Sequence, residues 1–350
     1  MKRFKKIYYS ASSVFPTGVL KRMAPAASLL PYHHLVSDEE VLHVKHLYPY
    51  KNVRQFEKDL DHLLKHFTPV AVDDLAGAVL SGKSTPRGSF LLTFDDGFRE
   101  VHEVIAPILS AKGIPAVFFI NPAFLDNRVL FYRCKISLVI EALLAKKDQL
   151  FLLKECEGLL GGEAADAQGL LDRLIRRIKK INNLDQHLLD GLAEKLGLSF
   201  EEYLQAQRPF MTVSQVKELH EKGFAIGAHS WDHPYYDLIS LEEQERQTLQ
   251  STRYVEENFS PSRRLFSFPH SDVNLSQDLF DKLLSGKTPT DVFFGIQNQL
   301  EEQPNRVLHR FNAERPDLPL ARQLNGVLLL MWYRKFLNKN MVIRNHVKKA

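Results

Sequence analysis

The chain has 350 residues, of which 44% are hydrophobic and 25% are charged, and its formal net charge is +4. This composition is that of an ordinary globular protein and excludes a fibrous or intrinsically disordered chain. The charge is too small to indicate nucleic-acid binding, so no nucleic-acid partner is expected. The two cysteines, Cys134 and Cys156, build no disulfide framework, and a reducing compartment is the default expectation.

The two ends of the chain are basic. Residues 1–27 lack the uninterrupted apolar core of a signal peptide, and no stretch reaches the roughly 18 apolar residues of a membrane span. Residues 313–350 are predicted to form a helical basic tail that contains GVLLLMWYRKFL at 326–337. This helix is expected either to pack on the core or to make peripheral contact with a membrane. The expected location is cytoplasmic, with the inner membrane face as the alternative.

Strands and helices alternate through most of the chain. Short apolar runs predict strands that end at His34 or lie at 69–72, 90–94, 114–120, 224–229, 265–269, 291–296 and 306–311. Helical spacing and capping residues predict helices at 53–67, from about 74, at 100–112, 212–223 and from 240. This alternation predicts an α/β fold with a parallel sheet or barrel, whose site lies at the carboxyl ends of the strands.

One part of the chain breaks the alternation. Residues 125–210 show only helical periodicity; in GLLDRLIRRIKKI, for example, Leu170, Leu174 and Ile178 fall on one stripe. The predicted organisation is therefore a barrel from 28–124 and 211–312, interrupted by a helical insertion.

Asp95 and Asp96 follow the apolar strand at 90–94 and precede Gly97. Adjacent carboxylates repel one another and resist burial unless a positive charge compensates them. A second pair, Asp73 and Asp74, opens a predicted helix, where helix capping is a sufficient explanation. The pair at 95–96 has no such explanation.

The motif GAHSWDHP places His229 and His233 four residues apart after another strand. Alone, this spacing is as well explained by surface or core histidines. Two histidines and a carboxylate are, however, a common ligand set for catalytic Zn²⁺, with one position left for water. Together with the aspartate pair, the histidines predict a metal site in which one aspartate binds the cation and the other serves as base.

The motifs TFDDG at 93–97 and HSWDH at 229–233, in this order, resemble those of the polysaccharide deacetylases (NodB-homology domain, carbohydrate esterase family 4). The resemblance runs from about Ser28 to Arg310. It implies a distorted, incomplete (β/α) barrel with a helical insertion, in which a metal-activated water attacks the acetamide carbonyl of an N-acetylated sugar. By the same resemblance Asp95 is the base, and the expected metal is Zn²⁺, with Co²⁺, Ni²⁺ or Fe²⁺ as alternatives; its ligands would be Asp96, His229 and His233.

Later motifs depart from the family pattern. Where the family often has Arg-x-Pro-Tyr, FSFPHSD gives Ser267 in place of the arginine. Arg310 is the candidate to replace it. The closing Leu-x-His is matched loosely by RVLHRF, so His309 is predicted either as the general acid or as a structural histidine. The residues expected to bind substrate are His33, Trp231, Pro269, His270 and Arg310. A buried, hydrogen-bonded role for His33 and simple packing for Trp231 remain alternatives.

The resemblance favours a metal-dependent hydrolase that removes acetyl groups from an N-acetylated glycan or a lipid-linked saccharide. Two alternatives stay open: a catalytically silent metal- and glycan-binding protein of the same fold, and a hydrolase of C–N bonds in small amides. The second carboxylate, Asp95, argues against the silent protein, because binding a metal does not require it.

Overall fold

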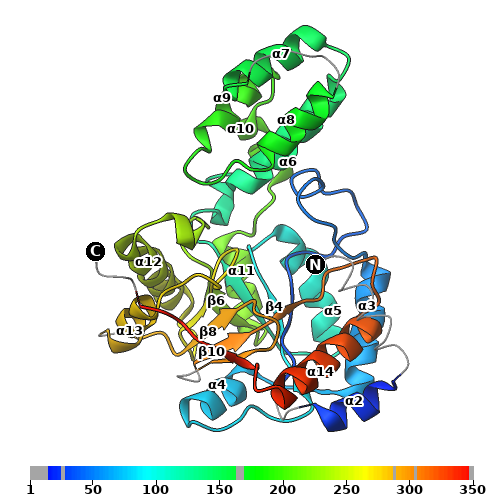
Figure 1. Cartoon of the computed structure of the whole chain (residues 1–350), viewed down its shortest axis with the longest axis vertical. Coiled ribbons are helices and arrows are strands. Elements are labelled where there is room, and N and C mark those ends of the chain that lie inside the picture. Colours follow the sequence, from blue (N-terminus) through cyan, green and yellow to red (C-terminus); the bar gives the residue numbers. More distant parts are fainter. Residues whose placement is uncertain (1–14, 25–27, 163–168, 287–288, 303–305, 347–350) are drawn as a thin grey trace. The chain divides into compact units, whose positions relative to one another are not determined.

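The computed structural model describes residues 15–24, 28–162, 169–286, 289–302 and 306–346 (Figure 1). The chain forms two compact units. The first comprises Met1–Asp38, Tyr50–Pro122 and Thr212–Ala350, and the second comprises Glu39–Pro49 and Ala123–Met211. Among the described residues, no helix has both the length and the apolar character needed to span a membrane.

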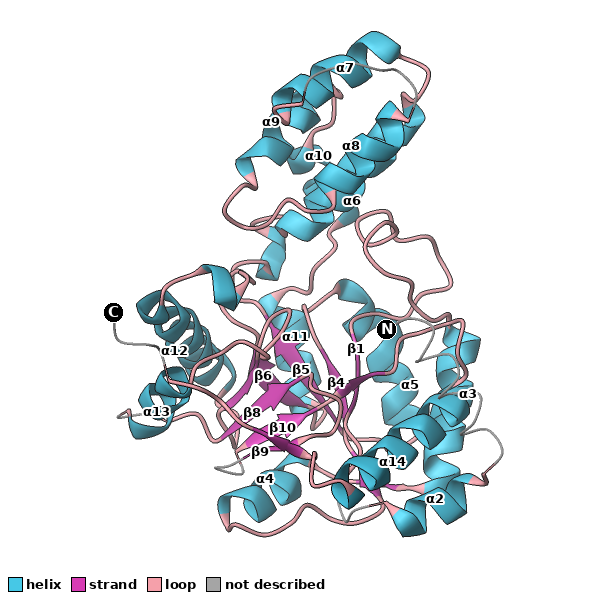
Figure 2. Ribbon diagram, viewed as in Figure 1, coloured by secondary structure: helices cyan, strands magenta, loops and turns pink. Residues whose placement is uncertain are grey.

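A nearly closed barrel of eight parallel strands, with helices around it, forms the first unit (Figure 2). Its strand order is β10-β8-β7-β6-β5-β4-β1-β11. Strands buried on both faces appear in sequence as continuous apolar runs, and all five residues of AVFFI in β5 are buried. The strands are β1 (Pro31–His33), β4 (Leu92–Phe94), β5 (Ala116–Ile120), β6 (Ala225–Ala228), β7 (Leu265–Ser267), β8 (Val292–Gly295), β10 (Val307–His309) and β11 (Phe311–Asn312).

The barrel is closed by one stretch of chain. Strand β10 pairs with β8 at one end of the sheet, while β11 pairs with β1 at the other end. A single residue, Arg310, separates the two strands. The segment 307–312 therefore joins both edges of the sheet, and Arg310 lies at the point of closure.

Helices cover the outside of the barrel. Capping boxes begin two of them, with Asn52 and Gln55 at α3 and the predicted Thr212 and Gln215 at α11. The strand predicted at 69–72 is shorter than expected, because only Thr68–Pro69 is extended before α4 begins. The helices of this unit are α2 (Thr17–Met23), α3 (Val53–His66), α4 (Val72–Leu80), α5 (Ala106–Ala111), α11 (Val213–Glu221), α12 (Leu241–Phe259), α13 (Gln277–Ser285) and α14 (Leu320–Phe336). Two short two-stranded sheets add β2 (Thr68–Pro69) with β3 (Ser89–Phe90), and β9 (Glu301–Glu302) with β12 (Met341–Val342).

The second unit contains the predicted helical insertion. Its α-helices are α6 (Tyr132–Ala145), α7 (Leu150–Leu159), α8 (Leu170–Ile178), α9 (His187–Lys195) and α10 (Phe200–Gln207). On α8, Leu170, Leu174 and Ile178 are buried, as their spacing predicts. Residues 39–49, which the sequence analysis assigned to the barrel, belong to this unit, and a ring nitrogen of His43 lies 3.0 Å from the hydroxyl of Tyr203.

Candidate metal centre and catalytic site

The motif residues lie at the carboxyl ends of two barrel strands, β4 and β6. Asp95 and Asp96 follow β4, and His229 follows β6, so all three leave the carboxyl ends of parallel strands. The ladder continues one residue past each strand: the N–H of Asp95 donates to the carbonyl of His33, and that of His229 donates to Ile120. Each of the three side chains is buried. This backbone pairing fixes where the side chains leave the barrel.

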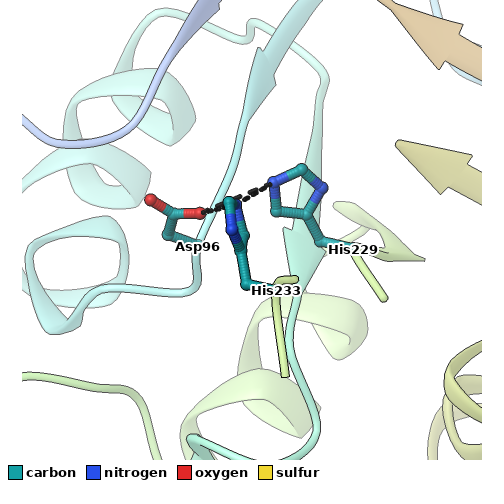
Figure 3. A group of neighbouring side chains, drawn as sticks. All are labelled: Asp96, His229 and His233. Atoms are coloured by element: carbon teal, nitrogen blue, oxygen red, sulfur yellow. Dashed lines mark hydrogen bonds and ion pairs between the residues drawn. The ribbon is translucent and has the colours of Figure 1, made fainter. Parts of the chain in front are cut away.

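Asp96, His229 and His233 point toward one another (Figure 3). His233 Nε2 lies 3.1 Å from His229 Nε2 and 3.2 Å from Asp96 Oδ1, and His229 Nε2 lies 3.5 Å from the same oxygen. Ligands of a tetrahedral Zn²⁺ at 2.0–2.1 Å stand about 3.3 Å from one another. Asp96 Oδ1 is buried without a hydrogen-bond partner among the described residues. The three atoms therefore fit a divalent cation.

The two histidines are oriented through their other ring nitrogens. His229 Nδ1 lies 2.8 Å from the carbonyl oxygen of Ser267, so it donates there and leaves the Nε2 lone pair toward the site. Burial lowers the pKa of His229 to about 4, which keeps the ring neutral, as a ligand must be. His233 Nδ1 lies 3.2 Å from His270 Nε2, and the His270 ring stacks on Tyr235 with centroids 3.6 Å apart.

Several residues of the site adopt left-handed backbone conformations. The φ angles are 72° at Asp96, 64° at Ser230, 60° at His233 and 56° at His270. Such conformations are costly outside glycine and concentrate at functional sites. Gly97 has φ of 68°, and a Cβ there would lie 3.4 Å from a side-chain atom of Ile120. The glycine after the two aspartates thus permits a left-handed turn at this position.

Arg310 compensates the charge of Asp95. Its two terminal nitrogens each lie 2.8 Å from one oxygen of the Asp95 carboxylate, a bidentate pair, and the same side chain donates to Thr93 and Ser267. Burial, the largest single effect, would raise the pKa of Asp95, but the charges of Arg310, His229 and His34 and the hydrogen bonds from Arg310 together outweigh it, and the pKa is lowered. The carboxylate remains 3.9 Å from His229 Nε2. The buried guanidinium of Arg310 therefore contacts Asp95 from the segment 307–312. Ser267 accepts one of its hydrogen bonds.

His34 is a site residue that the sequence analysis did not single out. Its Nδ1 lies 2.7 Å from Glu314 Oε2, and its side chain is 20% exposed. Burial would lower the pKa of His34, but the charge and hydrogen bond of Glu314, with the charges of Asp96 and Asp95, raise it to about 9. The ring is therefore an imidazolium at neutral pH. In the sequence, the position of His34 next to His33 at the end of a predicted strand was the signal that could have identified it.

The first histidine of that pair, His33, was predicted either to line the substrate pocket or to be buried and hydrogen-bonded. It is buried, with its ring stacked on Phe94 and edge-on to Phe56 of α3. Burial, followed by the charge of Lys51, lowers its pKa. Successive side chains of a strand face opposite sides, so His33 faces the surrounding helices.

His309, predicted as the general acid, lies in a different buried cluster. Its Nε2 is 2.9 Å from Glu302 Oε2, and its Nδ1 is 3.5 Å from Asp272 Oδ2. Arg344 bonds to both of these carboxylates and balances their charge. Because Arg310 points to Asp95, its neighbour in the strand points the other way. The structure does not bring His309 to Asp96, His229 and His233, and a structural role accounts for its contacts.

Four other residues were predicted to bind substrate: Trp231, Pro269, His270 and Arg310. Trp231 is half-buried and edge-on to Tyr254 of α12, with ring centroids 5.8 Å apart. This contact agrees with the alternative that Trp231 packs against the fold. Pro269 is buried two residues after the end of β7, and His270 follows it beside His233. Arg310 is fully buried and paired with Asp95, a position suited to holding the carboxylate.

The sequence model of a polysaccharide deacetylase family matches residues 82–146 and 180–281. These ranges include both aspartates and both histidines of the site, whereas Arg310 and His34 lie outside them. No curated protein matches the chain.

Solved structures share the fold at low sequence identity. A deacetylase, PplD, from Streptococcus pyogenes, in complex with acetate, is 12% identical with a TM-score of 0.53, over 87% of this chain and 99% of that one. IcaB from Ammonifex degensii is 15% identical with a TM-score of 0.51, over 87% and 98%. A de-N-acetylase from Aggregatibacter actinomycetemcomitans is 14% identical with a TM-score of 0.51, over 85% and 99%.

Proposed function

We propose that the chain removes acetyl groups from an N-acetylated amino sugar of a glycan or lipid-linked saccharide, since the sequence model of a polysaccharide deacetylase family matches residues 82–146 and 180–281. The observation that carries this proposal is the arrangement of the two adjacent aspartates. Asp96 faces two histidine nitrogens as a ligand would, and Asp95 is held beside them by Arg310. A divalent cation on Asp96, His229 and His233, with Zn²⁺ the first choice, would lower the pKa of a bound water and polarise the acetamide carbonyl.

Asp95 is assigned the role of general base. Its pairing with Arg310 keeps the carboxylate ionised and fixed, so it can accept the proton of the attacking water. A protein that only bound metal and glycan would not need this buried ion pair, whose two members must both be desolvated. The Asp95–Arg310 pair therefore favours hydrolysis over the catalytically silent alternative.

His34 is assigned the role of general acid. As an imidazolium it carries a second N–H at Nε2, in addition to the one that faces Glu314. Transfer of that proton to the sugar nitrogen would let the amine leave as acetate forms. The charges of Asp95 and Asp96 act on its pKa, which indicates that His34 lies near the proposed reaction centre.

His34→Gln is expected to lower kcat by roughly 10²–10⁴-fold, because the acid is lost. In the unchanged enzyme the proton is present below pH about 9 and lost above it, so activity should fall through that range. Glu314→Gln removes the attraction that raises the pKa, so the alkaline limb of kcat/KM should move to lower pH. The measurement is a pH profile of acetate release for each variant.

The matched control is His102→Gln, which removes another histidine paired with a glutamate, Glu218, at 3.0 Å. It should change neither kcat nor the profile. An alkaline limb that stays in place in Glu314→Gln would remove His34 from the acid role.

Acetate release from N-acetylglucosamine oligosaccharides should require metal. A chelator should abolish it and added Zn²⁺ should restore it, because the three ligands alone do not activate water. Acetylated xylan, an ester, serves as the comparison substrate, and small acetamides serve as a second. Glycan binding without acetate release would support the silent alternative, and release from small acetamides alone would support the small-amide hydrolase.

A further inference from the structure

Charge is unevenly distributed along the chain. Residues 1–27 contain six Lys and Arg residues and residues 318–350 contain seven, and neither range contains Asp or Glu. Since the whole chain has 46 basic and 42 acidic residues, residues 28–317 hold 33 basic residues against 42 acidic ones. Although the net charge is only +4, the two ends of the sequence are basic and residues 28–317 are acidic.

The fold brings the two basic ends together. Helix α2 packs against α14, as Figure 1 shows at the lower edge of the first unit. Thr17 Oγ1 donates to Asn325 Oδ1 over 2.8 Å, and Asn325 Nδ2 donates to the carbonyl of Phe15 over 2.9 Å. These buried amide contacts fix α2 on the first half of α14.

The surface called here the terminal face comprises residues 15–23, which include α2, together with α14 and the chain from there to Ile343. Eight of the sixteen large apolar side chains exposed among the described residues lie on these elements. Phe336 is 72% exposed and Ile343 is 86% exposed. The other six are Phe15, Val19, Met23, Tyr333, Leu337 and Met341. Exposed cations lie among them at Arg22, Arg322, Lys335 and Lys339.

We propose that the terminal face docks on the surface of a lipid bilayer that contains anionic lipids. Exposed aromatic and aliphatic side chains interleaved with cations are the chemistry of an interfacial segment, because the apolar groups enter the headgroup region while the cations pair with anionic headgroups. Tyr333 and the stacked rings of Trp332 and Phe336 suit that boundary. A nucleic acid would use the cations but not the apolar side chains. A symmetric dimer through this face would oppose two basic surfaces.

The proposal is independent of the site chemistry, since none of the catalytic residues lies on α2 or α14. It also gives a physical basis for the location at the inner membrane face, which stays a prediction.

The test is flotation of the full chain with vesicles of phosphatidylcholine alone or with added phosphatidylglycerol, at low and high salt. The unchanged protein should float with the anionic vesicles and be released by salt. Lys335→Glu with Lys339→Glu should weaken binding by at least roughly 30-fold, because the loss of each cation near an anionic surface alone removes a factor of about five and each added carboxylate is repelled. Tyr333→Ser with Phe336→Ser should reduce binding at both salt concentrations.

Two controls match these changes. Lys217→Glu with Lys222→Glu makes the same charge change on exposed residues of or next to α11, and Phe151→Ser removes an aromatic ring that is 77% exposed on α7. Both should float as the unchanged protein does. Circular dichroism and thermal unfolding report that each variant is folded. The proposal is overturned if the unchanged protein ignores anionic vesicles, if the controls lose binding equally, or if Phe336 instead supports self-association.

Discussion

Asp96→Asn and Asp95→Asn are expected to be equally inactive but to differ in metal content. In the first variant the metal site loses its charged oxygen, so affinity should fall by more than the roughly 10–100-fold that loss of an outer partner costs. In the second, the three proposed ligands remain. The rate should nevertheless fall by about 10²–10⁴-fold, because an amide cannot take the proton from water. Metal analysis of the purified variants and zinc titration calorimetry separate the two.

The chain offers its own control in the other aspartate pair. Asp74→Asn removes an exposed carboxylate from the first turn of α4. It should cost no more than about 0.3–1 kcal/mol of stability and leave metal and rate unchanged. Equal loss of metal from the Asp95 and Asp96 variants would make Asp95 a second ligand and contradict the division of roles.

Arg310→Met is expected to lower the free energy of unfolding by roughly 3–5 kcal/mol, because it leaves the Asp95 carboxylate buried without its counter-charge. The same variant should lose activity, since nothing then fixes the base. Combining it with Asp95→Asn should cost less than the sum of the two single changes, because the unpaired charge is gone. Chemical denaturation in the presence of a chelator measures stability without a contribution from metal binding.

An exposed pair provides the comparison. Arg315→Met breaks the contact of Arg315 with Asp317, whose side chains are 39% and 66% exposed, and should cost about 0–1 kcal/mol. Arg310→Lys keeps the charge but not the bidentate geometry, so it should recover part of the stability and little of the rate. Strict additivity of the Asp95 and Arg310 changes would mean that the two side chains do not act as a pair.

Much of the architecture was accessible from the sequence because its signals are local. Continuous apolar runs marked the buried strands, and the capping box at Thr212 marked a helix start. The strand ends carried the two motifs, so the meeting of Asp96 with the histidines follows from the parallel order of the sheet. The segment 39–49 has no such periodicity, and its place in the helical unit depends on tertiary contacts such as His43 with Tyr203.

Within the site, the sequence could not distinguish neighbouring residues of one strand. The charges of Asp95 and Asp96 act on His34, which was not singled out beside His33, and Arg310 rather than its neighbour His309 contacts Asp95. Side chains alternate along a strand, so a shift of one position moves a side chain to the other face. Both positions fall at short strands, β1 and β10, where too few residues establish which side chains face the site. Arg310 was named only as the replacement for the arginine missing from the family motif, since its partner Asp95 lies 215 residues away, beyond any local pattern.

The closure of the barrel by residues 307–312 sets the order in which the enzyme is completed during synthesis. The aspartates leave the ribosome early, but the cation that balances Asp95 is translated 215 residues later, on the strand that also joins the sheet edges. Until that strand docks, β1 and β8 present open edges and Asp95 is an unbalanced carboxylate. A nascent chain that ends before Arg310 therefore holds all four motif residues without the guanidinium that balances Asp95.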